Sequence, residues 1–189
     1  MAPVRPKISV LIFLILWVAG CATDHANRDP VGERFPAVSG DSLAGTETLL
    51  PDAIGGEPSL VLAGYAQATQ FDIDRWMLGL LQMDATLRVI EVPAIEGWFP
   101  STFLRPTIDG GMRDGIPQED WRSVVTLYGS DAARLQTFTG TERPGNARVL
   151  LLDSNGVVAW FWDQGYSPRR LREMLAIAAD VGSAGGTAE

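Results

Sequence analysis

The sequence has 189 residues, of which 46% are hydrophobic, and this is enough for one domain with a substantial core. Its net charge of −8 argues against nucleic acid as a partner, because such binding needs clustered basic residues. The only cysteine is Cys21 and the only histidine is His25, so a His/Cys metal site and a Ser/His/Asp triad inside the domain are excluded. We therefore expect neither a metal nor another cofactor.

The first 20 residues have the three parts of a secretory signal. Arg5 and Lys7 form a basic start, and an apolar run from Ile8 to Gly20 follows. This run is shorter than the about 20 apolar residues that a membrane-spanning helix needs. We expect residues 1–20 to be a signal peptide.

The run ends in Val18-Ala19-Gly20-Cys21, which resembles the lipobox of bacterial lipoproteins. The resemblance implies cleavage before Cys21 and acylation of this residue, and several acyl chains would anchor the protein firmly in a membrane. Ala22 follows the cysteine in place of aspartate, which implies the outer membrane of the bacterial cell envelope, facing the periplasm. The alternative is an ordinary signal or anchor helix that happens to contain Cys21.

The rest of the chain divides by composition into three parts. Residues 21–31 form the predicted lipid anchor and a short polar tether. Residues 32–181 form one predicted domain, and the Gly/Ala-rich residues 182–189 are expected to be a disordered tail.

The first half of the domain alternates between strands and a helix. A β-hairpin is predicted from residues 35–39 and 46–50, with its turn at Gly40-Asp41-Ser42. The run Ser59 to Ala63 is continuously apolar, which is typical of a central strand buried on both faces. A helix over 71–83 follows, and its inner face is predicted to hold Ile73, Met77, Leu80 and Leu81. The next buried strand is predicted over 87–92.

The second half continues the alternation. Residues 93–118 are rich in glycine and proline, with a possible short helix near 102–105. A strand at 123–128 and a helix at 131–138 follow, and the strands 148–152 and 157–162 flank an Asn155-Gly156 turn, a strong hairpin signal. Pro168 begins a closing helix that is predicted to reach residue 179.

This order of elements resembles the thioredoxin-like fold. The residues that carry the resemblance are Gly32-Glu33-Arg34-Phe35-Pro36, Leu60-Val61-Leu62 and Leu151-Leu152-Asp153-Ser154-Asn155-Gly156-Val157-Val158, which look like segments of peroxiredoxin-type domains. The resemblance implies an α/β fold with a thioredoxin-like central mixed β-sheet flanked by helices, together with an N-terminal β-hairpin.

The residues that carry the chemistry of such proteins are missing. The resemblance places an active cysteine in the loop 63–71, which contains none here, and a cis-proline at Ala147 or Arg148. We therefore expect no thiol-disulfide or peroxidase activity. A helix start can still bind an anion or a peptide carbonyl. The vacated position is a candidate cleft for a ligand or partner, formed by Tyr65, Gln67, Thr69 and Gln70.

The late hairpin adds a second resemblance. Its strand Ala159-Trp160-Phe161-Trp162, followed by Gly165 and the last helix, is similar to the assembly factor for the membrane sector of mitochondrial ATP synthase and its bacterial relatives. These proteins look like thioredoxin-like domains without active thiols. The resemblance implies a binding or assembly role but does not identify a client.

Aromatic residues provide a candidate partner surface. Trp160 and Trp162 alternate along one strand and so point to the same face, near the predicted edge of the sheet. Trp98 and Phe99 lie in the long variable segment, where exposed aromatics are typical interface anchors. In both places the alternative is that the side chains pack against the core, under the closing helix in the case of the tryptophans.

Acidic residues in the variable segment leave one further possibility. A carboxylate site could form among Asp109, Asp114, Glu119 and Asp120, although a solvated loop is the simpler interpretation and no calcium-loop spacing is present.

The preferred hypothesis is a membrane-anchored, redox-inactive binding or assembly module for another envelope protein. The alternatives are an enzyme or small-ligand binder that uses the polar residues of the cleft, and a structural envelope lipoprotein.

Overall fold

The computed structural model describes residues 25–95 and 109–185. Four predictions therefore lie outside the described residues: the signal peptide over 1–20, acylation of Cys21, the aromatic pair Trp98 and Phe99, and the short helix near 102–105. Within the described ranges, no helix is both long enough and apolar enough to cross a membrane.

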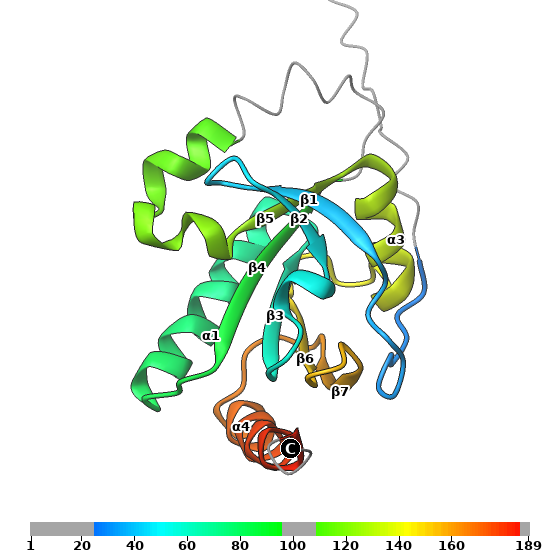
Figure 1. The fold of residues 1–189 in the computed structure, drawn as a ribbon. Helices are drawn as coiled ribbons and strands as arrows, with labels where there is room; N and C mark the ends of the chain where they lie inside the picture. The colour runs from blue at the N-terminus through cyan, green and yellow to red at the C-terminus, as the bar shows by residue number, and fades with distance from the viewer. Residues whose placement is uncertain (1–24, 96–108, 186–189) are drawn as a thin grey trace, which may run out of the picture.

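Seven strands form one mixed sheet in the order β2-β1-β5-β4-β3-β6-β7 (Figure 1). The strands are β1 Val38–Ser42, β2 Glu47–Leu50, β3 Ser59–Gly64, β4 Arg88–Ile95, β5 Val125–Tyr128, β6 Arg148–Leu152 and β7 Val158–Trp162. The central strands β3, β4 and β5 are parallel, whereas every other neighbouring pair is antiparallel. The predicted mixed sheet with an N-terminal hairpin is confirmed.

Helices cover both faces of the sheet. They are α1 Gln70–Gln82, α3 Gly129–Thr139 and α4 Pro168–Gly185, with a further helical stretch at 109–115. Figure 1 shows α1 and α3 on opposite sides of the sheet, and α4 packs in the same apolar cluster as α1. Three short 3-10 helices also occur, at Asp52–Ile54, Gln67–Thr69 and Gln118–Ser123.

Strand β3 explains why the core has two layers. Its side chains alternate between the faces, so Val61 and Ala63 join the cluster under α3 while Leu60 and Leu62 join the cluster under α1 and α4. All four are fully buried, as the continuous apolar run predicted.

The N-terminal hairpin turns later in the chain than predicted. Gly40 and Asp41 lie within β1, and the turn is closed by a hydrogen bond from the Ser42 amide to the Thr46 carbonyl at 2.9 Å. Gly40 serves close packing here, because a Cβ atom at this position would lie only 2.6 Å from the carbonyl oxygen of Thr126 on β5. Gly45, with φ +77°, is the glycine that the turn requires.

The closing helix is longer than predicted. α4 continues to Gly185, so residues 182–185 are helical and are not part of a tail, while residues 186–189 lie outside the description. The apolar stripe of α4 extends through Ala178 and Val181, which pack against the cluster that contains Trp160. This packing holds the helix beyond the expected end at residue 179.

Candidate functional site

The loop between β3 and α1 is closed onto the domain by two hydroxyl groups. The Tyr65 hydroxyl lies 2.5 Å from Thr139 Oγ1 and donates to the Leu135 carbonyl oxygen at 3.2 Å. The Thr69 hydroxyl, 1% exposed, donates to the Pro144 carbonyl oxygen at 2.7 Å. Burial raises the pKa of Tyr65 above its ordinary value, so the hydroxyl stays protonated and can act as a donor.

Asp72 fastens the start of α1 to the loop before β6. Its buried carboxylate accepts a hydrogen bond from the Ala147 amide at 3.0 Å and another from the Tyr166 amide at 2.7 Å. A proline at position 147 would have no N–H to donate. The position where the resemblance implies a cis-proline is therefore used differently in this chain.

The four residues of the predicted cleft therefore do not all face outward. Tyr65 and Thr69 turn inward, whereas Gln67 and Gln70 are exposed, and the Gln70 amide donates to Asp74 Oδ1 at 3.0 Å. The structure brings the four residues to one end of the sheet, but two of them stabilise the fold there.

Arg148 is the centre of this region. Its side chain is buried at the start of β6, and its guanidinium lies 5.3 Å from the centre of the Tyr65 ring. An arginine has five N–H donors, and here five acceptors lie within 2.5–3.3 Å. They are the carbonyl oxygens of Gly140, Glu142, Arg143 and Asn146 and the side-chain oxygen of Asn27. Burial lowers the pKa of Arg148, and the nearby carboxylate of Asp163 opposes this shift.

The described part of the predicted tether is bound to the domain. His25 and Thr141 exchange two hydrogen bonds of 2.8 Å each, and the Arg28 amide donates to the Thr139 carbonyl at 3.4 Å. The Asn27 side chain donates to Asp163 Oδ2 at 2.5 Å. The described part of the predicted tether is thus held on the domain surface at His25, Asn27 and Arg28.

The prediction of an exposed aromatic partner surface is wrong at Trp160. This side chain is 5% exposed, packs edge-to-face on Trp76 with ring centres 6.2 Å apart, and donates its Nε1–H to Glu173. Trp162 is half-buried, with the Arg170 guanidinium 4.1 Å from its ring centre. β7 is indeed an edge strand, but α4 covers the face that carries the tryptophans, which was the alternative interpretation.

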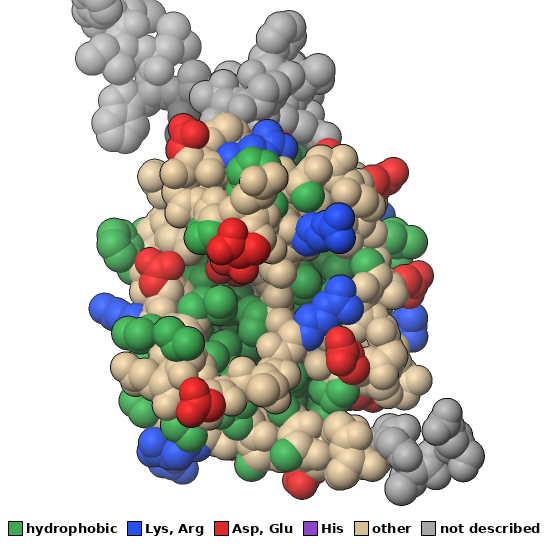
Figure 2. Space-filling model, turned by 60° about the vertical axis from the view of Figure 1, so that its left-hand side comes forward, with side chains coloured by type: hydrophobic (Ala, Val, Ile, Leu, Met, Phe, Trp, Pro, Cys, Tyr) green, Lys and Arg blue, Asp and Glu red, His purple; other side chains and the backbone are tan. Residues whose placement is uncertain are grey.

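An exposed apolar surface occurs instead on α1. Among the described residues, seven large hydrophobic side chains are exposed, and four of them lie on this helix: Phe71, Met77, Leu78 and Leu81. We call these four residues the α1 stripe. Figure 2, which turns the α1 side of Figure 1 forward, shows hydrophobic side chains at the surface of that side.

The buried face of α1 differs from the predicted one by a rotation about the helix axis. Ile73 and Leu80 are inside as predicted, but Met77 and Leu81 are exposed, and Trp76 and Gly79 fill the interior. Gly79 lets Tyr166 approach, because a Cβ atom there would lie 2.7 Å from the Tyr166 hydroxyl. One feature of the sequence does indicate exposed apolar residues on this helix: residues 70–82 contain more large apolar side chains than one helix face can bury.

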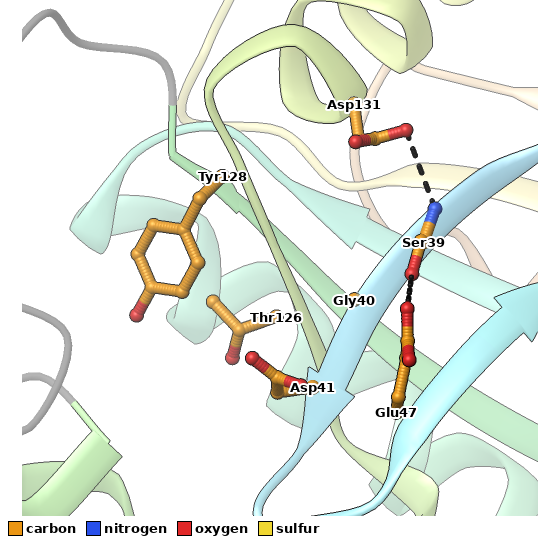
Figure 3. Close-up of a pocket in the computed structure, with 7 residues that line it drawn as sticks. All are labelled: Ser39, Gly40, Asp41, Glu47, Thr126, Tyr128 and Asp131. Carbon is orange, nitrogen blue, oxygen red and sulfur yellow. Dashed lines mark hydrogen bonds between the residues drawn. The ribbon is translucent and has the colours of Figure 1, made fainter. Parts of the chain in front are cut away.

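A polar pocket of about 200 Å³ opens beside β1 (Figure 3). Its lining is acidic and consists of Ser39, Gly40, Asp41, Glu47, Thr126, Tyr128 and Asp131. Ser39 engages two of the carboxylates, since its amide donates to Asp131 at 3.3 Å and its hydroxyl to Glu47 at 2.9 Å. Of the predicted carboxylate group, Asp109 accepts a hydrogen bond from Tyr128, and within the described ranges no three acidic, histidine or cysteine side chains form a metal site.

Comparison with known proteins shows the fold. No protein-family model matches the sequence, and no curated protein matches it either. Solved structures do match, among them a putative protein disulfide isomerase from Bacteroides thetaiotaomicron, with 13% identity, a TM-score of 0.54, and coverage of 86% of this chain and 95% of that one. BsSco, a member of the Sco family of cytochrome c oxidase assembly proteins, matches at 11% identity and a TM-score of 0.54, over 82% of this chain and 98% of that one. A SCO1/SenC family lipoprotein from Bacillus anthracis matches at 12% identity and a TM-score of 0.53, over 81% and 99%.

The domain therefore has the thioredoxin-like fold that its sequence resembles. At these identities the likeness concerns the fold alone. The residues that would carry function have to be judged from this chain, and the α1 stripe holds four of the seven large hydrophobic side chains that packing within the described part of the domain does not bury.

Proposed function

We propose that this protein is a membrane-anchored, redox-inactive thioredoxin-like module that binds, and helps to assemble, another protein of the bacterial cell envelope. The observation that carries the proposal is the α1 stripe, because several large apolar side chains exposed on one helix are typical of a protein interface. The loop 63–71 contains no cysteine, so this helix start has no thiol for redox chemistry.

The stripe has the composition of an interface centre. Phe71, Leu78 and Leu81 are 74%, 54% and 73% exposed. Burying these surfaces against a partner would contribute roughly 4 kcal/mol, taking about 1.5–3 kcal/mol for a fully buried side chain of this kind. Aromatic residues and methionine are also enriched in interfaces, and the stripe contains both.

Two resemblances support an assembly role. One solved structure with this fold is described as a member of a family of cytochrome c oxidase assembly proteins. The late hairpin of this chain is similar to that of the ATP synthase membrane-sector assembly factor, which also has no active thiols. Anchoring through acylated Cys21 in the outer membrane would keep the module in the envelope with its client.

The alternative of a small-ligand site at the predicted cleft has less support. The hydroxyl groups of Tyr65 and Thr69 are already engaged by the domain itself. Of the four residues of the predicted cleft, Gln67 and Gln70 are exposed, and Gln70 is bonded to Asp74.

Crosslinking in cells, followed by affinity capture and mass spectrometry, tests the proposal. The unchanged protein should enrich one envelope protein or complex, and the double variant Leu78→Glu with Leu81→Glu should lose it. Leu49→Glu is the matched control, because Leu49 is 49% exposed but lies on β2, away from the stripe. Equal capture by the double variant and by the control would contradict a role for α1.

A further inference from the structure

The segment before β1 is bound along the domain by hydrogen bonds at both of its ends. At one end His25 pairs with Thr141, and at the other the Gly32 amide donates to the Val158 carbonyl at 2.9 Å. The Phe35 amide donates to the Gly156 carbonyl at 2.8 Å, which fixes the entry into the hairpin. We call residues 25–32 the docked segment.

A polar lock at Asn27 holds the docked segment in place. Its side-chain amide donates to Asp163 and to the Glu142 carbonyl, and its side-chain oxygen accepts from Arg148. The backbone lies so close to Gly140 that a Cβ atom there would be 2.3 Å from the Asn27 Cα. Glycine at 140, with φ +83°, is therefore what lets the segment approach.

Docking sharply shortens the reach of the lipid anchor. His25 follows Cys21 by four residues, which span at most about 14 Å when fully extended. If the segment were free as far as Gly32, the reach would be about 40 Å. The docked segment thus ties an anchor at Cys21 to one fixed point on the domain.

We propose that the docked segment orients the domain so that the loop 140–143 and the C-terminal end of α3 face the phospholipid membrane. The proposal rests on the lipid anchoring of the proposed function. Glu142 and Arg143 are both exposed on this loop, and their charged side chains keep the loop at the lipid surface, because charged groups do not enter the hydrocarbon core.

The orientation also positions the α1 stripe. The start of α1 is tied to the same loop by the Thr69–Pro144 hydrogen bond, so Phe71 lies toward the membrane. Leu81 is ten residues farther along the helix, which corresponds to about 15 Å. A partner that binds the stripe must therefore present a surface close to the membrane.

Energy transfer to the membrane surface tests the orientation. The lipidated full-length chain carries a fluorophore at Glu142→Cys or, in a second sample, at Glu57→Cys, in phosphatidylcholine vesicles that contain an acceptor-labelled lipid. Acylated Cys21 has no free thiol, so only the introduced cysteine reacts. Glu57 is exposed and precedes β3, whose opposite end leads to Tyr65, and the strand itself spans about 20 Å.

The expected result is a higher transfer efficiency from position 142 than from position 57. Inserting about ten Gly/Ser residues after Ala22 keeps the docked contacts but frees the domain, so the difference should be lost. Asn27→Ala should reduce the difference, while His25→Ala, which keeps the backbone hydrogen bonds to Thr141, should preserve it.

Two outcomes would overturn the proposal. Equal transfer from the two positions in the otherwise unchanged protein would show that the domain is not oriented by the segment. Failure of an alkyne-tagged fatty acid to label Cys21 in cells would remove the anchor on which the orientation rests. Capture of a partner through α1 is a separate measurement. The proposed binding role therefore does not depend on the membrane orientation of the domain.

Discussion

Replacing Arg148 by methionine is the strongest test of how the docked segment and the loop 140–146 are held together. Methionine fills much of the same space, but it donates no hydrogen bonds to the four carbonyl oxygens and the Asn27 oxygen that the guanidinium satisfies. The substitution also removes the contact with the Tyr65 ring. The docked segment and the loop 140–146 would lose their common partner.

The expected loss in the free energy of unfolding is about 3 kcal/mol. Hydrogen bonds to a charged group contribute roughly 1.5–3 kcal/mol each, but removing the charge also relieves the cost of burying it. Several of the carbonyl groups are partly buried and can turn to water, which limits the loss further. Breaking a buried polar network typically costs about 3–5 kcal/mol, and the lower end of this range applies here.

Urea unfolding of the chain from residue 22 onward measures this loss. With an m-value of about 2 kcal/mol/M, the midpoint should fall by about 1.5 M. The control is Arg172→Met, because Arg172 is exposed on α4 and should change the stability by no more than about 0.5 kcal/mol. A loss below about 1 kcal/mol for Arg148→Met would refute the reasoning that this residue organises the region.

Three further changes test other parts of the account. Burial raises the pKa of Glu91, so its ionised form is disfavoured in the folded state, and the free energy of unfolding should fall as the pH rises through that raised pKa. Glu91→Gln should flatten this part of a plot of the urea midpoint against pH, and an unchanged slope would contradict the assignment. Gly40→Ala should cost about 1–3 kcal/mol in urea unfolding, because the added Cβ meets the β5 backbone, whereas Gly110→Ala, in open space, should not destabilise. The double variant Leu78→Glu with Leu81→Glu should change the free energy of unfolding by no more than about 1 kcal/mol, because both side chains are exposed. A larger loss would mean that the stripe stabilises the domain itself.

Local patterns in the sequence were sufficient to predict the strands of the central sheet. The continuous apolar run at Ser59 to Ala63 predicted a strand buried on both faces, and the Asn155-Gly156 turn predicted the hairpin of β6 and β7. These features depend on neighbouring residues, so they can be read without knowledge of the tertiary contacts. The same is true of the missing cysteine in the loop 63–71, which is a fact of composition.

The features that were missed depend on contacts between distant parts of the chain. Gly40 suggested a turn because glycine favours turns, but its role is the close approach of β5, about 85 residues later. The inner face of α1 is rotated from the predicted one because Tyr166 packs against Gly79, and this contact cannot be predicted from the periodicity of apolar residues. Asn27 looked like part of a polar tether, and only the fold brings Asp163 and Arg148 to its side chain.

Site-specific photocrosslinking from α1 tests the central claim most directly. A photoreactive amino acid placed at Leu81 in the lipidated protein in cells should crosslink to one defined envelope protein, because this side chain is 73% exposed in the stripe. The same probe at Leu49 on β2 should not give that product. A shared background at both positions, or a defined product from Leu49 alone, would contradict the account of α1 as the partner-binding surface.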